Sequence, residues 1–247
     1  MLPSTLDRIA VAWNVVSGVP HGWVPGKITV ASSAASAIAP PGWVGTIRLG
    51  AGSVAAGALI TAPDEPQAAL VRDTLGTAQP EQATDRPAWG SLWPSDPGCI
   101  LGPAELAYLD APDFAPRVGE PVEAVALADV EDAIAALERD AGPDDANEVG
   151  ITDATSPLFV IWRAATIAGV CAYRPWVGRL AHMMVLTHPD HRGQGLAKRA
   201  ATEASRHALD AGLIPQWRAR APASQAVARS VGYTTVGAQL SLRLRLR

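Results

Sequence analysis

Residues 185–198 read Val-Leu-Thr-His-Pro-Asp-His-Arg-Gly-Gln-Gly-Leu-Ala-Lys: an aliphatic run, a polar corner and a glycine turn. After Gly195 an alanine-rich pattern of helical period begins. The first turn of a helix leaves backbone N–H groups without helical partners and carries the positive end of the helix dipole. Glycine has no side chain to hold a ligand away from those groups. The stretch therefore predicts an anion site, of the kind that binds the phosphates of a nucleotide-like cofactor.

The spacing of the glycines separates this stretch from two common nucleotide motifs. A Walker loop would continue with Gly-Lys-Ser/Thr, and a dinucleotide fingerprint would be followed about 20 residues later by an acidic strand end. For Gly-x-Gly alone, a turn that only joins a strand to a helix is the simpler alternative. The full string from His188 to Ala197 resembles the signature loop of the GNAT superfamily, the acyl-CoA-dependent N-acyltransferases. Its pattern, Arg/Gln-x-x-Gly-x-Gly/Ala, matches Arg192-x-x-Gly195-x-Ala197.

Composition bounds the class of protein. The 247 residues are 48% hydrophobic and 18% charged, which is typical of a soluble globular chain. The longest nearly uncharged apolar stretch, residues 49–62, is too short and glycine-rich to span a bilayer, and we see no secretion signal. Cys99 and Cys171 lack metal spacing, so we expect two buried thiols in a reducing compartment, with the cytoplasm as the default. Aromatic and basic residues do not alternate as they do in many nucleic-acid-binding proteins, so the sequence does not suggest that function.

Charge is distributed unevenly along the chain. Residues 113–153 hold twelve acidic and two basic side chains, whereas residues 154–247 hold three acidic and thirteen basic ones. One interpretation is two solvated faces that differ in sign. The other is a basic part that meets an anionic cofactor and an acidic part that faces a cationic substrate.

The order of predicted elements divides the chain into two parts. Residues 1–110 predict a smaller α/β domain. Three roles are open for it: a degenerate copy of the C-terminal fold, a substrate-shaping domain or a dimerisation element. Prolines at 112, 116 and 121 mark residues 111–120 as a linker. The pattern over 121–247 is similar to the GNAT core, which implies an α/β (α+β) fold with a mixed, mostly antiparallel sheet flanked by helices. Strands are expected at 27–30, 44–49, 53–61, 122–127, 158–162, 167–173, 179–187, 214–220 and 239–245, and helices at 2–17, 64–75, 103–109, 129–141, 195–211 and 222–231.

The resemblance also implies which residues hold the donor. In this family the strand before the loop splays from its neighbour, and its backbone holds the pantetheine arm, while the loop wraps the pyrophosphate. Acetyl-CoA is accordingly the expected co-substrate, with no metal. The positions that match are Val185, Leu186 and Thr187 on the strand, and Arg192, Gly193, Gln194, Gly195, Leu196, Ala197 and Lys198 in the loop and first helical turn.

Catalytic side chains are harder to assign, because the sequence departs from the family. Gln216 stands where many members have a glutamate, Ala221 where many have an asparagine, and Ala228 where many have a tyrosine. Three replacements are candidates for proton transfer. They are His182, whose ordinary pKa suits a base near neutral pH, Glu148 in an acidic loop at 144–148, and Ser224 at the start of the last helix. The alternatives are a core histidine, a solvated charge and a capping serine.

The expected activity is transfer of an acetyl group from acetyl-CoA to a primary amine by direct attack in a ternary complex. The alternative is a non-catalytic, acyl-CoA-binding regulatory module of the same fold. The acceptor is a small-molecule or peptide amine, with no nucleic-acid or membrane partner and with a homodimer as an open possibility. Acidic residues at 144, 145, 148 and 153 suggest a cationic acceptor, and aromatic residues at 162, 173, 176 and 217 would supply apolar or cation–π walls if they are not simply core.

Overall fold

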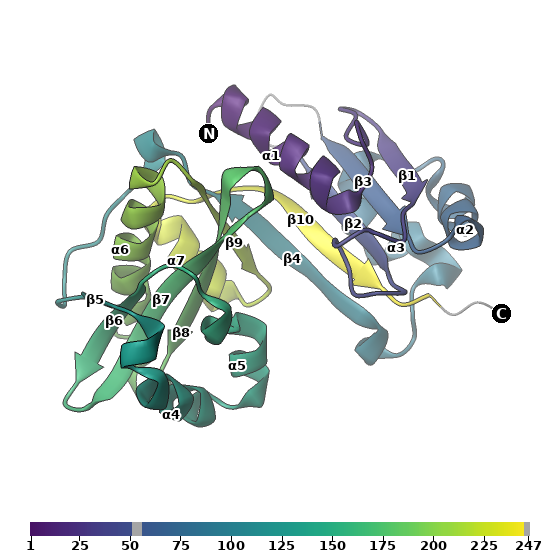
Figure 1. Ribbon diagram of the computed structural model, residues 1–247. Helices are drawn as coiled ribbons and strands as arrows, with labels where there is room; N and C mark the ends of the chain where they lie inside the picture. The colour runs from purple at the N-terminus through teal and green to yellow at the C-terminus, as the bar shows by residue number, and fades with distance from the viewer. Residues whose placement is uncertain (51–55, 245–247) are drawn as a thin grey trace. The chain divides into compact units, whose positions relative to one another are not determined.

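The computed structural model describes residues 1–50 and 56–244 (Figure 1). These residues form two compact units. The C-terminal unit holds Met1 and Tyr108–Thr234, and the N-terminal unit holds the described residues of 2–107 together with 235–244. The last strand thus groups with the N-terminal unit, whereas the sequence division gave residues 121–247 to one domain. The boundaries at 110 and 121 stay a prediction.

The N-terminal unit is a five-stranded sheet in the order β1-β3-β2-β10-β4, with helices packed against it. Strand β1 runs parallel to β3, while β2 is antiparallel to both β3 and β10. Predicted residues 53–55 and 245 lie outside the described residues. The elements are α1 Pro3–Ser17, β1 Ile28–Ser32, β2 Val44–Leu49, β3 Gly57–Ala62, α2 Glu65–Leu75, α3 Arg86–Trp89, β4 Ile100–Tyr108 and β10 Thr234–Leu242.

Local signals explain the helices of this unit. Helix α1 buries Ile9, Trp13 and Val16, a spacing that places them on one face. Helix α2 begins after Asp64, whose Oδ1 accepts a hydrogen bond from the Gln67 backbone N–H at 2.9 Å. The predicted helices at 2–17 and 64–75 are confirmed. No helix among the described residues is both long and apolar enough to cross a bilayer.

The helix predicted at 103–109 is wrong, because this stretch belongs to strand β4. Its Ala-Glu-Leu-Ala sequence has high helix propensity, which is a weak preference that tertiary packing overrides. Leu106 and Tyr108 are fully buried on one side of the strand, and Ala107 and Leu109 are buried on the other. A segment covered on both faces gains more from an extended conformation in the sheet than from its local preference.

The C-terminal unit has a sheet in the order β9-β8-β7-β6-β5, in which β8 and β9 are parallel and the other neighbours antiparallel. This is the mixed, mostly antiparallel sheet with flanking helices that the sequence predicts, so the fold class is confirmed. The elements are β5 Glu123–Val125, α4 Glu131–Ala141, α5 Pro143–Val149, β6 Leu158–Arg163, β7 Thr166–Trp176, β8 Leu180–Thr187, α6 Leu196–Asp210, β9 Ile214–Ala219 and α7 Pro222–Val231.

Helices α4 and α6 cover opposite faces of this sheet (Figure 1). Ala172 of β7 packs in the core with Ile134 and Leu137 of α4, whereas the hydroxyl of the next residue, Tyr173, lies 2.7 Å from Nδ1 of His207 on α6. Successive strand residues point to opposite faces, which fixes the two sides. The alanines of α6 let it approach the sheet closely, as the sequence predicts; those fully buried are Ala200, Ala201, Ala204 and Ala208.

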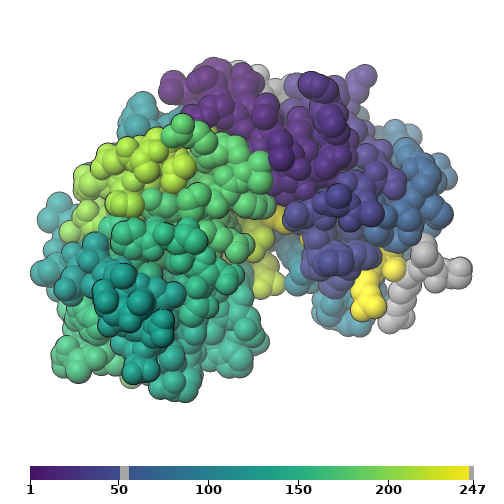
Figure 2. Space-filling model, viewed as in Figure 1, coloured from purple at the N-terminus to yellow at the C-terminus, as the bar shows by residue number. Residues whose placement is uncertain are grey.

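Residues 144–148, predicted as an acidic loop, form helix α5 instead. Three local signals support a helix: Pro143 at its first position, Asp144 and Asp145 in its first turn, and Gly150 in the left-handed conformation at its end. Figure 2 shows α4 and α5 as part of the outer surface of their unit. Acidic composition alone was a poor guide to structure here.

The expected linker, residues 111–120, is fastened to helices α6 and α7. The Arg117 backbone N–H donates to Oγ1 of Thr202 at 3.0 Å, and Nε of Arg199 donates to the Glu120 carbonyl at 3.0 Å. The Ala115 N–H donates to the Val231 carbonyl at 2.9 Å. The segment thus has a defined path over its own unit.

Gly232 ends helix α7 directly beneath this segment, and a Gly232→Ala variant is expected to be strongly destabilised. Its φ of +105° disfavours any side chain, and a Cβ would lie 2.0 Å from the Asp113 carbonyl oxygen. We expect the free energy of unfolding to fall by about 2–4 kcal/mol in urea denaturation. Gly195→Ala is the matched control, since Gly195 is also left-handed, with φ +83° and ψ 3°, and has nothing within 4 Å of its Cβ position. Equal losses in the two variants would contradict the proposed overlap.

Candidate functional site

Strands β8 and β9 part after a short parallel pairing. Leu180–His182 pair with Ile214–Gln216. Among the described residues, the pairing of these two strands ends with His182 and Gln216. Strand β8 nevertheless continues to Thr187 and β9 to Ala219. The backbone groups of β8 that face β9 beyond His182 therefore lack strand partners and are available to a ligand. The three strand residues predicted to contact the cofactor, 185–187, all lie on this open edge.

The glycine turn follows directly on the parted strand. Gly193 and Gly195 have φ of +78° and +83°, and a Cβ built on either would meet nothing within 4 Å. Glycine is thus required here for its backbone conformation, and the space above the turn is open. Helix α6 starts at Leu196 without a side-chain cap and without an acidic residue in its first turn. The unpaired N–H groups and the positive dipole end are left for an anion.

Two cations accompany the turn. Arg192 is half exposed, and its Nη2 lies 2.8 Å from Oδ2 of Asp145 on α5, while Nε donates to the Thr187 carbonyl at 3.4 Å. Lys198 is exposed in the first turn of α6. A surface ion pair of this kind contributes little to stability, so a phosphate can compete with Asp145 for the guanidinium.

His182 lies at the last paired position, where the strands begin to part. Its Nδ1 is 3.2 Å from Oε1 of Gln216, and Nε2 of Gln216 donates to the Tyr108 hydroxyl at 3.1 Å. Because an amide oxygen only accepts hydrogen bonds, this contact requires the imidazole proton on Nδ1. Nε2 of His182 then carries the lone pair, which is the arrangement a proton acceptor needs.

Burial lowers the pKa of His182 to about 4, and the charges of Arg218 and Arg174 act in the same direction. The hydrogen bond with Gln216 opposes this shift. The imidazole is therefore neutral at physiological pH and able to accept a proton, although it is a weaker base than a solvated histidine.

Glu148 and Ser224, the other two candidates, are engaged elsewhere. Glu148 is exposed on α5 and accepts from Arg220, with Nε to Oε1 at 3.2 Å and a second contact between Nη2 and Oε2. Oγ of Ser224 accepts from the Trp217 indole N–H at 3.0 Å. The structure brings neither side chain into contact with His182, so the three candidates do not form one constellation.

The acidic helix α5 and its flank are paired with arginines of the same unit. Beyond the contacts of Asp145 and Glu148, Oδ2 of Asp153 accepts from Arg174 at 3.3 Å. The acidic stretch of the sequence and the basic stretch after it thus meet in the fold. Carboxylates on α5 and just after it form ion pairs with arginines on β7, just after β9 and on the glycine loop. Neither sequence interpretation of that charge anticipated this pairing.

The aromatic residues proposed as acceptor walls are dispersed. The Trp176 ring centroid lies 6.3 Å from that of His182, on the same side of the strands. Tyr173 contacts α6 on the other face, Trp217 packs edge-on against the buried Tyr233 at 5.3 Å, and the Trp162 indole donates to Glu123. Only Trp176 of the four lies beside His182.

Sequence reasoning missed Gln216 and Tyr108. Gln216 was interpreted only as a missing glutamate. Pairing the two predicted strands in parallel, with His182 opposite Gln216, would have suggested their contact. Tyr108 gave no such signal, because its segment was predicted to be a helix. Neither cysteine lies among these groups. Cys171 is fully buried, which raises the pKa of its thiol well above the ordinary value, while Cys99 is half-buried rather than buried as expected.

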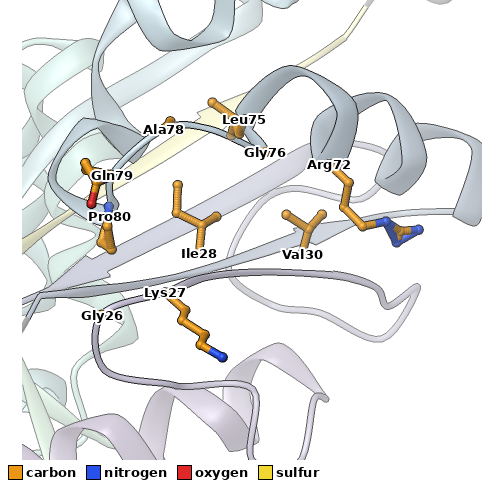
Figure 3. Close-up of a pocket in the computed structure, with 10 residues that line it drawn as sticks. All are labelled: Gly26, Lys27, Ile28, Val30, Arg72, Leu75, Gly76, Ala78, Gln79 and Pro80. Atoms are coloured by element: carbon orange, nitrogen blue, oxygen red, sulfur yellow. The ribbon is translucent and has the colours of Figure 1, made fainter.

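A separate pocket of about 390 Å³ lies in the N-terminal unit, between β1 and the end of α2 (Figure 3). Ile28 and Val30 line it, and Figure 3 shows the charged ends of Lys27 and Arg72 pointing away from these two side chains. It contains none of the predicted site residues.

Residues 159–239 match the family model described as GNAT acetyltransferase. This stretch is a GNAT acetyltransferase domain. It includes the parted strands, the glycine turn and helices α6 and α7, but begins after α4 and α5. No curated protein matches the sequence.

Solved structures with the same description resemble the chain distantly. A GNAT-family acetyltransferase from Colwellia psychrerythraea is 14% identical over 59% of this chain and 57% of its own, with a TM-score of 0.48. A GCN5-related N-acetyltransferase from Kribbella flavida is 18% identical over 58% of each chain, with a TM-score of 0.47. The chain thus spans less than three fifths of either. A GCN5-related N-acetyltransferase-like protein from Streptococcus suis is 14% identical over 99% of this chain and 100% of its own, with a TM-score of 0.43.

Proposed function

We propose that this protein is an acyl-CoA-dependent N-acyltransferase that transfers an acetyl group from acetyl-CoA to a primary amine. The observation that carries the proposal is the open edge of β8 beyond His182, which leads directly into an uncapped helix start with two glycines at positive φ. An extended chain with a phosphate terminus fits that sequence of features. The GNAT match over the same residues supports an acyl-CoA as this ligand.

Each part of the site has a role in the proposed reaction. Backbone groups of residues 185–187 hold the pantetheine arm, and the N–H groups of 193–198, with Arg192 and Lys198, bind the pyrophosphate. Acetyl-CoA supplies the acetyl group as a thioester. Nε2 of His182 accepts a proton from the acceptor ammonium, directly or through water. The free amine nitrogen attacks the thioester carbonyl, the carbon–sulphur bond breaks, and CoA leaves as a thiolate that takes up the second proton lost by the nitrogen. The fully buried thiol of Cys171 favours direct transfer without an acyl-enzyme.

The proposed acceptor is a small-molecule or peptide amine. Three of the four carboxylates that suggested a cationic acceptor form ion pairs with Arg174, Arg192 and Arg220, which weakens the attraction of this face for a cation.

One second function has an observation in its favour. Glu148 and Ser224 are engaged with other residues, and burial raises the pKa of Tyr233 well above its ordinary value, which leaves few groups ready for proton transfer. These features favour a regulatory module that binds acyl-CoA without turnover.

Release of free thiol separates the two functions. Purified protein is incubated with acetyl-CoA and a panel of primary amines, including small molecules and peptides with free N-termini or lysines, and the free thiol of CoA is measured. We expect amine-dependent release well above the rate without amine. Tight CoA binding in calorimetry with no amine-dependent release from any member of the panel would favour the regulatory module.

A further inference from the structure

Gln216 connects two side chains that come from different parts of the chain. Tyr108 ends β4, Gln216 lies in the middle of β9, and His182 is opposite Gln216 on β8. Gln216 is 1% exposed and Tyr108 is fully buried, so water does not compete for the bond between them. The glutamine amide thus donates at one end to the phenol oxygen and accepts at the other from the imidazole.

The orientation of this amide decides which nitrogen of His182 carries the proton. If the amide group were reversed, its NH₂ group would face Nδ1 and would require the lone pair there, with the proton on Nε2. In the structure the NH₂ group faces the Tyr108 hydroxyl and donates to its oxygen at 3.1 Å. The oxygen is left to face Nδ1 at 3.2 Å.

We propose that Gln216 is a positioning residue that fixes the His182 tautomer with its lone pair on Nε2, and that Tyr108 holds the Gln216 amide in the required orientation. The inference rests on the proposed function, in which Nε2 of His182 accepts the proton of the amine. It also explains why a glutamine serves at this position. A neutral acceptor sets the tautomer without adding a negative charge beside the imidazole.

The charged groups that act on His182 come from both neighbouring strands. They are Arg174 on β7 and Arg218 on β9, both cationic. A carboxylate at position 216 would oppose them and would favour the protonated imidazole. Gln216→Glu and Gln216→Met therefore separate the two properties of the residue. Glutamate keeps an acceptor and adds charge, whereas methionine keeps the approximate size and removes the acceptor.

The test is ¹⁵N NMR of the imidazoles in uniformly labelled protein, with the His182 signals identified by their absence in a His182→Gln variant. We expect wild-type His182 at neutral pH to carry its proton on Nδ1. Gln216→Met is expected to populate both tautomers and to lower kcat about five- to tenfold, the effect of one lost hydrogen bond, with little change in KM for acetyl-CoA. Gln216→Glu is expected to restore the tautomer and to raise the pH of the acid limb of kcat by about 1–3 pH units.

Wild-type protein with the proton on Nε2 would overturn the proposal, as would a tautomer that stays on Nδ1 in Gln216→Met. Tyr108→Phe gives a further measurement in a variant of almost unchanged shape, and it is expected to give a mixture of tautomers. These readouts do not require turnover. If no amine is acetylated, a fixed Nδ1–H tautomer still supports the positioning role, and the proposed function alone fails.

Discussion

A Gly195→Trp variant is expected to lose coenzyme A binding while keeping its fold. The indole would occupy the open space above the first turn of α6, where a Cβ at this position meets nothing within 4 Å. It would cover the N–H groups proposed to receive the pyrophosphate. The strain of a side chain at φ +83° costs about 1–2 kcal/mol, which a folded domain of this size tolerates. We expect calorimetry to show at least about a 100-fold loss of affinity, or roughly 2.7 kcal/mol.

Gly42→Trp is the matched control for this loss. Gly42 has φ +81° and likewise has nothing within 4 Å of its Cβ position, but it lies between β1 and β2 in the N-terminal unit. It carries the same strain and the same added side chain without touching the glycine turn. Circular dichroism should show both variants folded, and only Gly195→Trp should lose affinity. If folded Gly195→Trp keeps the wild-type affinity for CoA, the assignment of the loop as the phosphate site is wrong.

Elements encoded by local signals were predicted well. Helix α2 has its cap at Asp64, a proline in its first turn and a glycine after its end, and these lie within a dozen residues of one another. The glycine turn and the start of α6 are equally local. The part of the candidate site made by backbone could therefore be predicted, since its geometry depends on residues next to one another in sequence.

Elements decided by packing were predicted poorly. Strand β4 has a helix-favouring composition, and it is extended because its second half is buried on both faces. The last strand was predicted as a strand from its own alternation, but its partner was not predicted. Its register pairs Leu240 with Thr46 and Gly237 with Leu49, nearly 200 residues away. No pattern within one segment reports such a pairing.

Side-chain roles were the least predictable part, because they depend on partners far along the chain. The acidic stretch at 144–148 suggested a substrate-facing loop, yet Glu148 is joined to Arg220 and Asp145 to Arg192. Histidine at 182 was a candidate by residue type alone, and its state depends on Gln216, 34 residues later. A carboxylate or imidazole in a sequence shows which chemistry is available, while its neighbours decide whether it is used.

His182→Ala is expected to lower kcat about 100-fold at neutral pH while leaving acetyl-CoA binding nearly unchanged. General bases contribute about 10²–10⁴-fold, and a pKa lowered to about 4 places His182 at the weak end of that range. Because burial lowers this pKa from 6.5, the imidazole is neutral and active above about pH 4 and is lost as a base only below it. The wild-type profile of kcat should therefore fall on the acid side near pH 4, and this limb should be missing from the variant.

The free energy of unfolding should also depend on the protonation of His182, and it should fall as the pH falls. The unfolded chain binds a proton at His182 at higher pH than the folded protein does, so protonation favours unfolding. The contribution of the neutral imidazole is fully present above about pH 6.5 and is lost as pH falls toward 4. Urea unfolding between these values should show a smaller decline for His182→Ala than for wild type.

His207→Ala distinguishes a catalytic histidine from one that only contributes a hydrogen bond. Nδ1 of His207 lies 2.7 Å from the Tyr173 hydroxyl. His207→Ala therefore removes a hydrogen bond between a histidine and a neutral side chain, as His182→Ala does. His207 lies on α6, on the face of the sheet opposite α4, where its ring contacts Tyr173 and Phe159. We expect His207→Ala to keep the acid limb and to change kcat less than about threefold. If His182→Ala also kept the wild-type pH profile, His182 would be structural, and Glu148, released from Arg220 by a bound substrate, would become the base to test.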